Sequence, residues 1–407
     1  MSGENFRYEV AITRTTATAL RMHRRLWQAA LMLLPATAAC GQPAARQGEA
    51  AASGDLPFTT TVAADFDSPW AMAFLPGSTW AAVTEKKGAI KLWNSRGNAP
   101  LIDVRGVPAV SFGGQGGLGD ILFEPGGGKG GRYPFYLSWV EAEGETRGAV
   151  VGRGVLQLRG NQASISGMNV IWRQAPKVTG GGHFSHRLAI SPDGQYLYVT
   201  SGDRQKMTPA QADDGLLGKV LRLTRDGKPA PGNPMAAKGG LASQFWTIGH
   251  RNLLGIDFAP NGSLWVSEMG PKGGDELNLI VAGRNYGWPN ASGGSHYDDA
   301  EIPDHRAGDG YEAPKVNWTP SISPGGLMIY SGRKFARWTG DALVPALSGQ
   351  AIIHVDLDGD RVVGQASYPM NARIRAIEEG PDGTIYALED ERNGSQGRLL
   401  RLEPAKN

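Results

Sequence analysis

The chain repeats one pattern of hydrophobic and polar positions: a short apolar run, a turn that contains proline with Gly, Asp or Asn, and a second apolar run. It recurs five times, with turn prolines Pro76, Pro125, Pro192, Pro260 and Pro381. Apolar runs of this length are typical of strands, and Asp-Gly or Asn-Gly between them is typical of tight hairpin turns. The pattern therefore predicts a chain of β-hairpins.

The spacing of the turns indicates how the hairpins are arranged. The intervals between the prolines are 49, 67, 68 and 121 residues, and the last is about twice the others, so one degenerate copy is expected there. Residues 325–330 and 342–347 offer strands for it. Units of this length suit four-stranded blades. We expect an all-β, six-bladed β-propeller, closed by residues 397–402 or 58–62; a β-sandwich would explain the strands but not the period.

The N-terminal segment has the order of a secretory signal. Basic residues at 21–25 precede an apolar run at 26–34, and small residues follow as far as Cys40, the only cysteine. We expect residues 1–40 to be a signal peptide that directs the protein to the periplasm. The position of Cys40 resembles a lipoprotein attachment site, although Thr37 stands where such sites usually carry Leu; a plain cleaved signal is the alternative.

Three further expectations concern domains and partners. Residues 1–20 fit no signal pattern, and Met22 would begin a more ordinary signal. Residues 41–56 have the composition of a flexible tether, and residues 57–407 form the propeller. Because Lys+Arg (41) and Asp+Glu (39) nearly balance, no nucleic-acid partner is expected, and the membrane is reached only through an anchor at Cys40.

Polar residues beside glycine clusters are the candidates for chemistry. His183 leaves the glycine run 180–182, and Asp203 ends the next strand of the same hairpin. An Asp near a His orients the ring and suits general-base chemistry, although a loop His is more often structural. Arg251 follows an aromatic strand and would clamp a carboxylate or polarise a carbonyl, or else form an ordinary ion pair.

Two further segments suggest charged ligands. Arg373 and Arg375 flank one residue, so they point to the same side of a strand; this favours a ligand with several carboxylates, against the alternative of a solvated face. Residues 268–278 combine acidic side chains with exposed carbonyls, which suit calcium, and residues 284–289 add loop oxygens. The alternative for both loops is an acidic turn without an ion.

Taken together, these segments resemble the soluble quinoprotein glucose/sorbosone dehydrogenase family, in particular its aldose sugar dehydrogenase branch. The resemblance runs from residue 67 to residue 402, and its most specific stretches are 249–252, 268–271, 275–278 and 285–289. It implies a six-bladed propeller that uses pyrroloquinoline quinone (PQQ) and Ca²⁺. It also implies oxidation of aldoses at C1 to lactones, with electrons passed to an external quinone or cytochrome.

The resemblance also implies roles for individual residues. His183 would be the catalytic base and Asp203 would orient it. Residues that contact the cofactor would be Gln115, Arg251, Asn252, Arg373 and Arg375, with Arg251 and Asn252 at the quinone carbonyls. The backbone carbonyls of Gly270 and Pro271 would hold the calcium that bridges to the cofactor. Glu276 and Tyr286 match a second, structural calcium site.

The sequence departs from the glucose dehydrogenase pattern at three places. Gly182 precedes the base where that branch has an acidic substrate contact. Residues 348–350 stand where a cofactor-binding Lys is expected. His186 stands where Gly or Ser is expected, and would alter substrate access if it pointed into the site.

Two other functions remain open from the residues alone. A calcium-dependent lactonase on a six-bladed propeller would hold its ion with Asn, Asp or Glu side chains and would not need the arginine pair. A non-catalytic exported sugar-binding propeller would not need His183, Arg251 and Arg373 to converge. The positions of these three residues therefore discriminate between the functions.

Overall fold

The computed structural model describes residues 56–406 except Asn98 and Asn393. The expectations for the signal peptide and for most of the tether lie outside these residues. Among them, strands predominate, and the helices are short 3₁₀ turns: η1 (Lys129–Gly131), η2 (Thr208–Gln211), η3 (Ala236–Lys238), η4 (Gly240–Gln244) and η5 (Ala336–Trp338). None of these helices is long and apolar enough to cross a membrane.

The first half of the described chain forms three antiparallel runs of four strands. The first contains β2 (Pro69–Phe74), β3 (Trp80–Glu85), β4 (Ala89–Asn94) and β5 (Ile102–Arg105). The second contains β6 (Leu118–Phe123), β7 (Arg132–Glu143), β8 (Thr146–Arg159) and β9 (Gln162–Arg173). Parallel pairing of β5 with β9 joins these two runs into one eight-stranded sheet. The third contains β10 (Ser185–Ile190), β11 (Tyr196–Ser201), β12 (Lys219–Thr224) and β13 (Phe245–Ile248).

The second half adds three more four-stranded sheets. The first contains β14 (Asn252–Phe258), β15 (Leu264–Met269), β17 (Asp275–Ile280) and β19 (Val316–Trp318), and the next contains β20 (Met328–Ile329), β21 (Ala342–Ala346), β22 (Ala351–Asp358) and β23 (Arg361–Pro369). The last contains β24 (Ile374–Glu379), β25 (Ile385–Glu389), β26 (Arg398–Pro404) and β1 (Phe58–Asp65). A small two-stranded sheet consists of β16 (Lys272–Gly273) and β18 (Gly294–Ser295).

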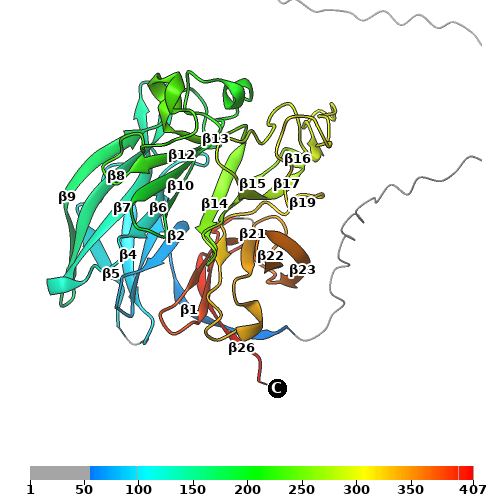
Figure 1. Ribbon diagram of the computed structural model, residues 1–407. Helices are drawn as coiled ribbons and strands as arrows, with labels where there is room; N and C mark the ends of the chain where they lie inside the picture. The colour runs from blue at the N-terminus through cyan, green and yellow to red at the C-terminus, as the bar shows by residue number, and fades with distance from the viewer. Residues whose placement is uncertain (1–55, 98, 393, 407) are drawn as a thin grey trace, which may run out of the picture. The chain divides into compact units, whose positions relative to one another are not determined.

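The first strands of the six runs form an inner ring. In chain order, β2, β6, β10, β14, β20 and β24 each contact the next, and β24 contacts β2. The ring is closed by the two ends of the described chain, because β1 pairs antiparallel with β26 from Phe58↔Pro404 to Asp65↔Arg398 (Figure 1). Both segments proposed for closure are therefore used, paired with each other. The expectation of an all-β fold is confirmed, and the arrangement is propeller-like.

The recurring prolines mark the hairpin between the first and second strand of a sheet. In the β10–β11 turn, the Asp193 carboxylate accepts a hydrogen bond from the Gln195 amide at 3.0 Å, and Gly194 takes the left-handed conformation (φ 70°) that glycine adopts without strain. Pro76, Pro125, Pro260 and Pro381 lie at the same place in their own sheets. The link from β20 to β21 contains η5 instead of this turn, which explains the doubled interval.

The apolar core is divided into clusters that lie between neighbouring sheets. One cluster joins Leu92 of β4 to Leu137 of β7, and another joins Tyr198 of β11 to Leu264 of β15. Because alternate residues of a strand face opposite sides, each sheet buries apolar residues on both faces. This packing fixes the angle between sheets, and hence the positions of the residues at the ends of the ring.

Candidate active site

Residues that are far apart in the sequence meet because they occupy equivalent positions in different sheets. Gln115 precedes β6, His183 precedes β10, Arg251 precedes β14 and Arg373 precedes β24. One cavity is lined mainly by residues at the starts of the inner strands, and a different cavity by residues at their ends. The starts therefore lie together at one end of the ring, and the three discriminating residues, His183, Arg251 and Arg373, lie at that end.

Three cavities lie at the starts of the strands. The cationic cavity, of about 170 Å³, is lined among others by Lys86, Gln115, His186, Arg373, Arg375 and Arg392. The histidine cavity, of about 380 Å³, is lined among others by His183, Asp203, Gln205, Arg251, Trp288 and Tyr297. The small cavity, of about 10 Å³, is lined among others by Glu268, Gly270, Pro271, Glu276 and Tyr286. Except for Asn252, the predicted site residues line one or more of these cavities.

His183 and Asp203 form a buried pair. The Nδ1 atom of His183 lies 2.7 Å from Oδ1 of Asp203, which is fully buried. Asp203 also accepts hydrogen bonds from Nε1 of Trp288 and from the backbone amide of Gln205, both at 2.8 Å. Burial opposes ionisation of Asp203, but these donors hold its pKa below the usual value. A carboxylate bound to Nδ1 fixes the proton there, so the lone pair of His183 is on Nε2.

The pKa of His183 is lowered, chiefly by burial and further by the charge of Arg251, against the raising effect of Asp203. The ring is therefore neutral at neutral pH and able to accept a proton. The His183 amide donates to Oε1 of Gln115 at 2.7 Å, and this contact connects the base to the wall of the cationic cavity.

Arg251 lies where the histidine cavity meets the small cavity. Its guanidinium donates to the carbonyl of Met269 at 3.0 Å, to the carbonyl of Gly270, and to the hydroxyl of Tyr297 at 3.1 Å. Its Nε is buried without a hydrogen-bond partner among the described residues. Asn252 is fully buried, and its Oδ1 accepts a hydrogen bond from the hydroxyl of Ser185, which lines the cationic cavity.

The cationic cavity holds more positive than negative charge. Asp390 accepts hydrogen bonds from Arg373 and Arg375, both at 3.1 Å, and from Lys86 at 3.5 Å. Burial opposes ionisation of Asp390, but Arg375, Lys86 and Arg373 lower its pKa to about 2. Burial lowers the pKa of Lys86, and Asp390 partly offsets this effect. With Arg392 on the wall, one carboxylate faces four cationic side chains, and this excess suits a ligand with several negative charges.

Sequence reasoning missed Lys86, Asp390 and Arg392. At the position where a lysine was expected, Ser348 is exposed and its hydroxyl bonds to Ser323 at 2.7 Å. Lys86 reaches the cavity from the first sheet instead. The third departure, His186, lines the cationic cavity and stacks on Trp70, with ring centroids 5.1 Å apart; burial lowers its pKa to about 3.

The small cavity has the donor set of a cation site. Glu268 and Glu276 are buried, and Nδ2 of Asn278 donates to both, at 3.2 and 2.9 Å. Burial raises the pKa of Glu268 to about 7; burial and the neighbouring Glu268 raise that of Glu276 well above its usual value. Oδ1 of Asn278 and Nδ1 of His250 are buried without hydrogen-bond partners among the described residues, although this Nδ1 lies 3.4 Å from Oε2 of Glu268. A cavity of this size admits about one water-sized particle, and its oxygens suit calcium.

Two predicted calcium ligands are engaged in other contacts. The Gly270 carbonyl accepts a hydrogen bond from Arg251, so a cation bound there would require the guanidinium to move. The hydroxyl of Tyr286 donates to the carbonyl of Leu279 at 2.5 Å and accepts from the amide of Val281 at 2.9 Å. The hydroxyl of Tyr286 is therefore already satisfied, although the residue lines the small cavity.

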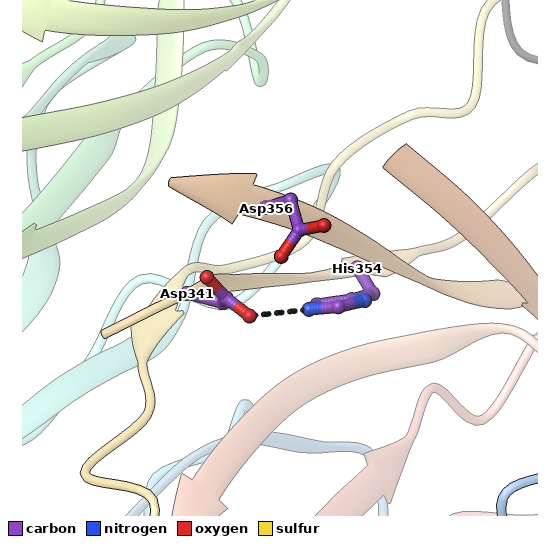
Figure 2. A group of neighbouring side chains, drawn as sticks. All are labelled: Asp341, His354 and Asp356. Carbon is purple, nitrogen blue, oxygen red and sulfur yellow. Dashed lines mark hydrogen bonds and ion pairs between the residues drawn. The ribbon is translucent and has the colours of Figure 1, made fainter. Parts of the chain in front are cut away.

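A separate group of ligand-type side chains lies between β21 and β22. Figure 2 shows Asp341, His354 and Asp356, whose ligand atoms lie within 4.8 Å of one another. Nε2 of His354 lies 2.7 Å from Oδ2 of Asp341, and the other oxygen of Asp341 accepts the Leu357 amide at 3.0 Å. The ring of His354 packs beside Trp338 and Tyr368. No buried polar atom of these three residues lacks a partner, so the group is explained as a packed His–Asp pair.

Comparison with known proteins agrees with the fold. The family described as "Glucose / Sorbosone dehydrogenase" matches residues 66–401. Aldose sugar dehydrogenase YliI of Escherichia coli is 34% identical over 343 residues, which cover 83% of this chain and 90% of that protein. Quinoprotein glucose dehydrogenase B of Acinetobacter calcoaceticus is 37% identical over 187 residues, which cover 40% of this chain and 37% of that protein.

Solved structures with the same fold include enzymes of this kind. A glucose dehydrogenase crystal structure has a TM-score of 0.78 and 37% identity, covering 85% of this chain and all of that one. The PQQ-bound form of aldose sugar dehydrogenase from Streptomyces coelicolor has a TM-score of 0.70 and 26% identity, covering 85% of this chain and 98% of that one.

Proposed function

Because this chain belongs to the glucose/sorbosone dehydrogenase family, we propose that it oxidises aldose sugars at C1 to lactones, with PQQ as its cofactor. The observation that carries the proposal is the adjacency of two features at one end of the ring. These are the neutral base His183 held by Asp203, and the cavity lined by Lys86, Arg373, Arg375 and Arg392.

The cationic cavity fits the cofactor by charge. PQQ is a tricarboxylic quinone, and its carboxylates would pair with Arg373, Arg375 and Lys86, whose charges Asp390 neutralises only in part. Gln115 would contact it from the side of the base. When bound, the quinone supplies the acceptor for the hydride that leaves the sugar C1.

The chain's own residues perform the proton transfer. Nε2 of His183 accepts the proton of the C1 hydroxyl, while Asp203 holds the ring and stabilises the imidazolium that results. Arg251 places a fixed positive charge on the wall of the same cavity, and Asn252 lies next to it in the chain. A fixed charge there favours the movement of negative charge away from the sugar.

Calcium belongs to the same proposal. Glu276, with Glu268 and Tyr286, would hold a structural ion in the small cavity. The carbonyls of Gly270 and Pro271 would hold a second ion, which supplies Lewis acidity when bound. For that ion, Arg251 must give up its contact with Gly270.

The remaining parts of the proposal concern architecture and location. The ring of six inner strands supports a six-bladed propeller over residues 57–407. We propose a periplasmic protein with an external quinone or cytochrome as electron acceptor, anchored to the membrane if Cys40 is lipidated. The arginine pair with Lys86 favours the dehydrogenase over a lactonase or a non-catalytic sugar-binding protein, because neither of these needs an excess of cations beside the base.

Reconstitution tests the proposal. Protein purified without cofactor is mixed with PQQ and Ca²⁺, and dye reduction is followed with several aldoses. We expect activity that requires both additions, and a loss of about 10²- to 10⁴-fold in kcat in His183→Ala with cofactor binding retained. Binding of PQQ without turnover of any aldose would reopen the substrate. Absence of PQQ binding would overturn the assignment.

A further inference from the structure

The side chain of Gln205 occupies the space beside the catalytic base that Gly182 leaves empty. A Cβ atom built on Gly182 would lie 2.5 Å from Oε1 and 2.7 Å from Cδ of Gln205. The carboxamide therefore lies over the residue that directly precedes His183, and it lines the same cavity as His183.

The backbone of Gln205 is fixed by its neighbours, while its side chain is exposed to solvent. Its amide donates to Oδ1 of Asp203, the carboxylate that orients the base, at 2.8 Å. Both Arg204 and Gln205 have left-handed backbone conformations (φ 55° and 59°), which cost energy in residues other than glycine. Arg204 is buried, and its guanidinium donates to the carbonyls of Gly180 and Gly182, at 2.6 and 2.8 Å.

Of the other polar groups on the wall of the histidine cavity, Tyr297 and Asp203 are already engaged, whereas the imidazole of His296 makes no hydrogen bond to another described residue. The hydroxyl of Tyr297 accepts a hydrogen bond from Arg251, and Asp203 is bound to His183 and Trp288. The carboxamide of Gln205 makes no hydrogen bond to any other described residue, so both its donor and its acceptor are free for a ligand.

We propose that Gln205 is the specificity-determining residue of this site: its carboxamide binds the hydroxyl on the carbon next to the one that is oxidised. The inference rests on the proposed function. The carboxamide of Gln205 lies beside His183, over Gly182. A sugar whose C1 hydroxyl reaches His183 therefore places the hydroxyl of the next carbon near this carboxamide.

A carboxamide at this position explains broad selectivity. It is neutral and it both donates and accepts, so it can bind a hydroxyl of either configuration, whereas a carboxylate only accepts. We therefore expect aldoses that differ only in the configuration of that hydroxyl to have similar KM values.

The test compares glucose with 2-deoxyglucose, which lacks that hydroxyl. For each sugar we would measure the Kd by calorimetry on the cofactor-free protein, and kcat and KM on the reconstituted protein. One hydrogen bond should make glucose bind about three- to tenfold more tightly than 2-deoxyglucose in the wild type. In Gln205→Ala this difference should vanish, with the KM for 2-deoxyglucose and both kcat values unchanged.

Two further variants make the test specific. Gly182→Ala adds a methyl group that must displace the carboxamide; Gly182 does not have a left-handed backbone, and the displaced atoms end a flexible side chain. It should reproduce the phenotype of Gln205→Ala. Lys206→Ala changes an exposed neighbour and should leave the preference as in the wild type.

The outcomes separate this inference from the proposed function. If Gln205→Ala discriminates between the two sugars as the wild type does, the inference is wrong, and turnover by the wild type would still support the dehydrogenase. If the wild type binds aldoses in a manner that depends on Gln205 but does not oxidise them with PQQ, the inference stands and the dehydrogenase assignment fails. If the wild type neither binds an aldose without PQQ nor oxidises one with PQQ, both are overturned.

Discussion

The two ends of the inner strands carry opposite charges. At their starts, Lys86, Arg373, Arg375 and Arg392 surround the cationic cavity. At their ends, an acidic cavity of about 450 Å³ is lined among others by Asp120, Asp257, Glu378 and Glu379. Cations therefore gather at the starts of the inner strands, and carboxylates, together with Arg187, at their ends.

A single layer separates the two cavities. Arg187 of β10 bonds to Asp120 at 3.1 Å on the acidic side, and its guanidinium lies 3.9 Å from the ring centre of Trp70, which lines the cationic cavity. It also donates to the carbonyls of Leu254 and Gly325, both at 2.7 Å. This residue ties three inner segments together across the axis of the ring.

The two ends compensate their charge in different ways. At the cationic end, Asp390 stays ionised, and the positive charge that it does not neutralise favours binding of an anionic ligand. At the acidic end, burial, reinforced by Asp257 and Asp120, raises the pKa of Glu378 to about 8, and burial raises that of Asp257 to about 6. A bound proton neutralises the charge of Glu378, as an anionic ligand would neutralise the charge of the arginines. Changes at the starts should therefore alter binding and catalysis, and changes at the ends should alter stability.

The largest effect is expected from Asp203→Asn at the cationic end. The amide keeps the shape of the side chain but no longer fixes the proton on Nδ1 of His183, so kcat should fall by about 10²- to 10⁴-fold. Asp203 raises the pKa of His183, so its removal should also move the acid limb of the kcat–pH profile to lower pH. Stopped-flow rates between pH 4 and 8, measured on protein saturated with PQQ, would show both changes. A profile that falls uniformly, without a shift, would contradict the role given to Asp203.

An intermediate effect is expected from Lys86→Ala. Loss of one buried cation from the cationic cavity should weaken binding of PQQ by about ten- to a hundredfold, measured by titration of the cofactor-free protein. Lys87→Ala is the matched control, because this neighbour is exposed and pairs with Asp67 at 2.7 Å. If the two variants bound PQQ with equal affinity, Lys86 would not contribute to cofactor binding.

The smallest effect is expected at the acidic end, from Glu378→Gln. Between pH 4.5 and 8 the folded protein keeps a proton on Glu378 that the unfolded chain has lost, so this group lowers stability as pH rises. The amide cannot ionise, so Tm at pH 9 should rise by a few degrees, with little change at pH 4.5 and none in kcat. Glu145→Gln, in the exposed β7–β8 turn, should not change Tm at either pH. A change in kcat for Glu378→Gln would contradict the division between the two ends.

The hairpin repeat and the residues that directly precede inner strands could be predicted from the sequence. The Pro-Asp-Gly and Pro-Asn-Gly turns have the geometry their residues require, so the period was visible. His183 stood out because it leaves a glycine run, and Arg373 with Arg375 because both flank one strand residue. These features depend only on residues that are adjacent in the sequence, so they could be recognised without knowledge of the fold.

The contacts that depend on two different sheets could not be predicted in the same way. Lys86 and Asp390 each directly follow the second strand of a sheet, close to where Asp203 follows β11. Their shared position after a second strand would have identified them. The candidate residues were polar residues beside glycine clusters, and neither of these two stands beside one. That Lys86 of the first sheet lines the same cavity as Arg373 and Arg375 of the last became visible only in the folded ring. The position of Gln205 over Gly182 depends on a backbone conformation that its residue type does not favour.

The pairing of β1 with β26 has a mechanical consequence. Phe58, at the beginning of one strand, lies opposite Pro404, at the end of the other, so the chain enters and leaves the sheet side by side. A tension applied between the two ends would load the first rung of this ladder alone, then the next, as in a zipper. The ring would thus open at its own seam under little force, while its other sheets keep their pairing.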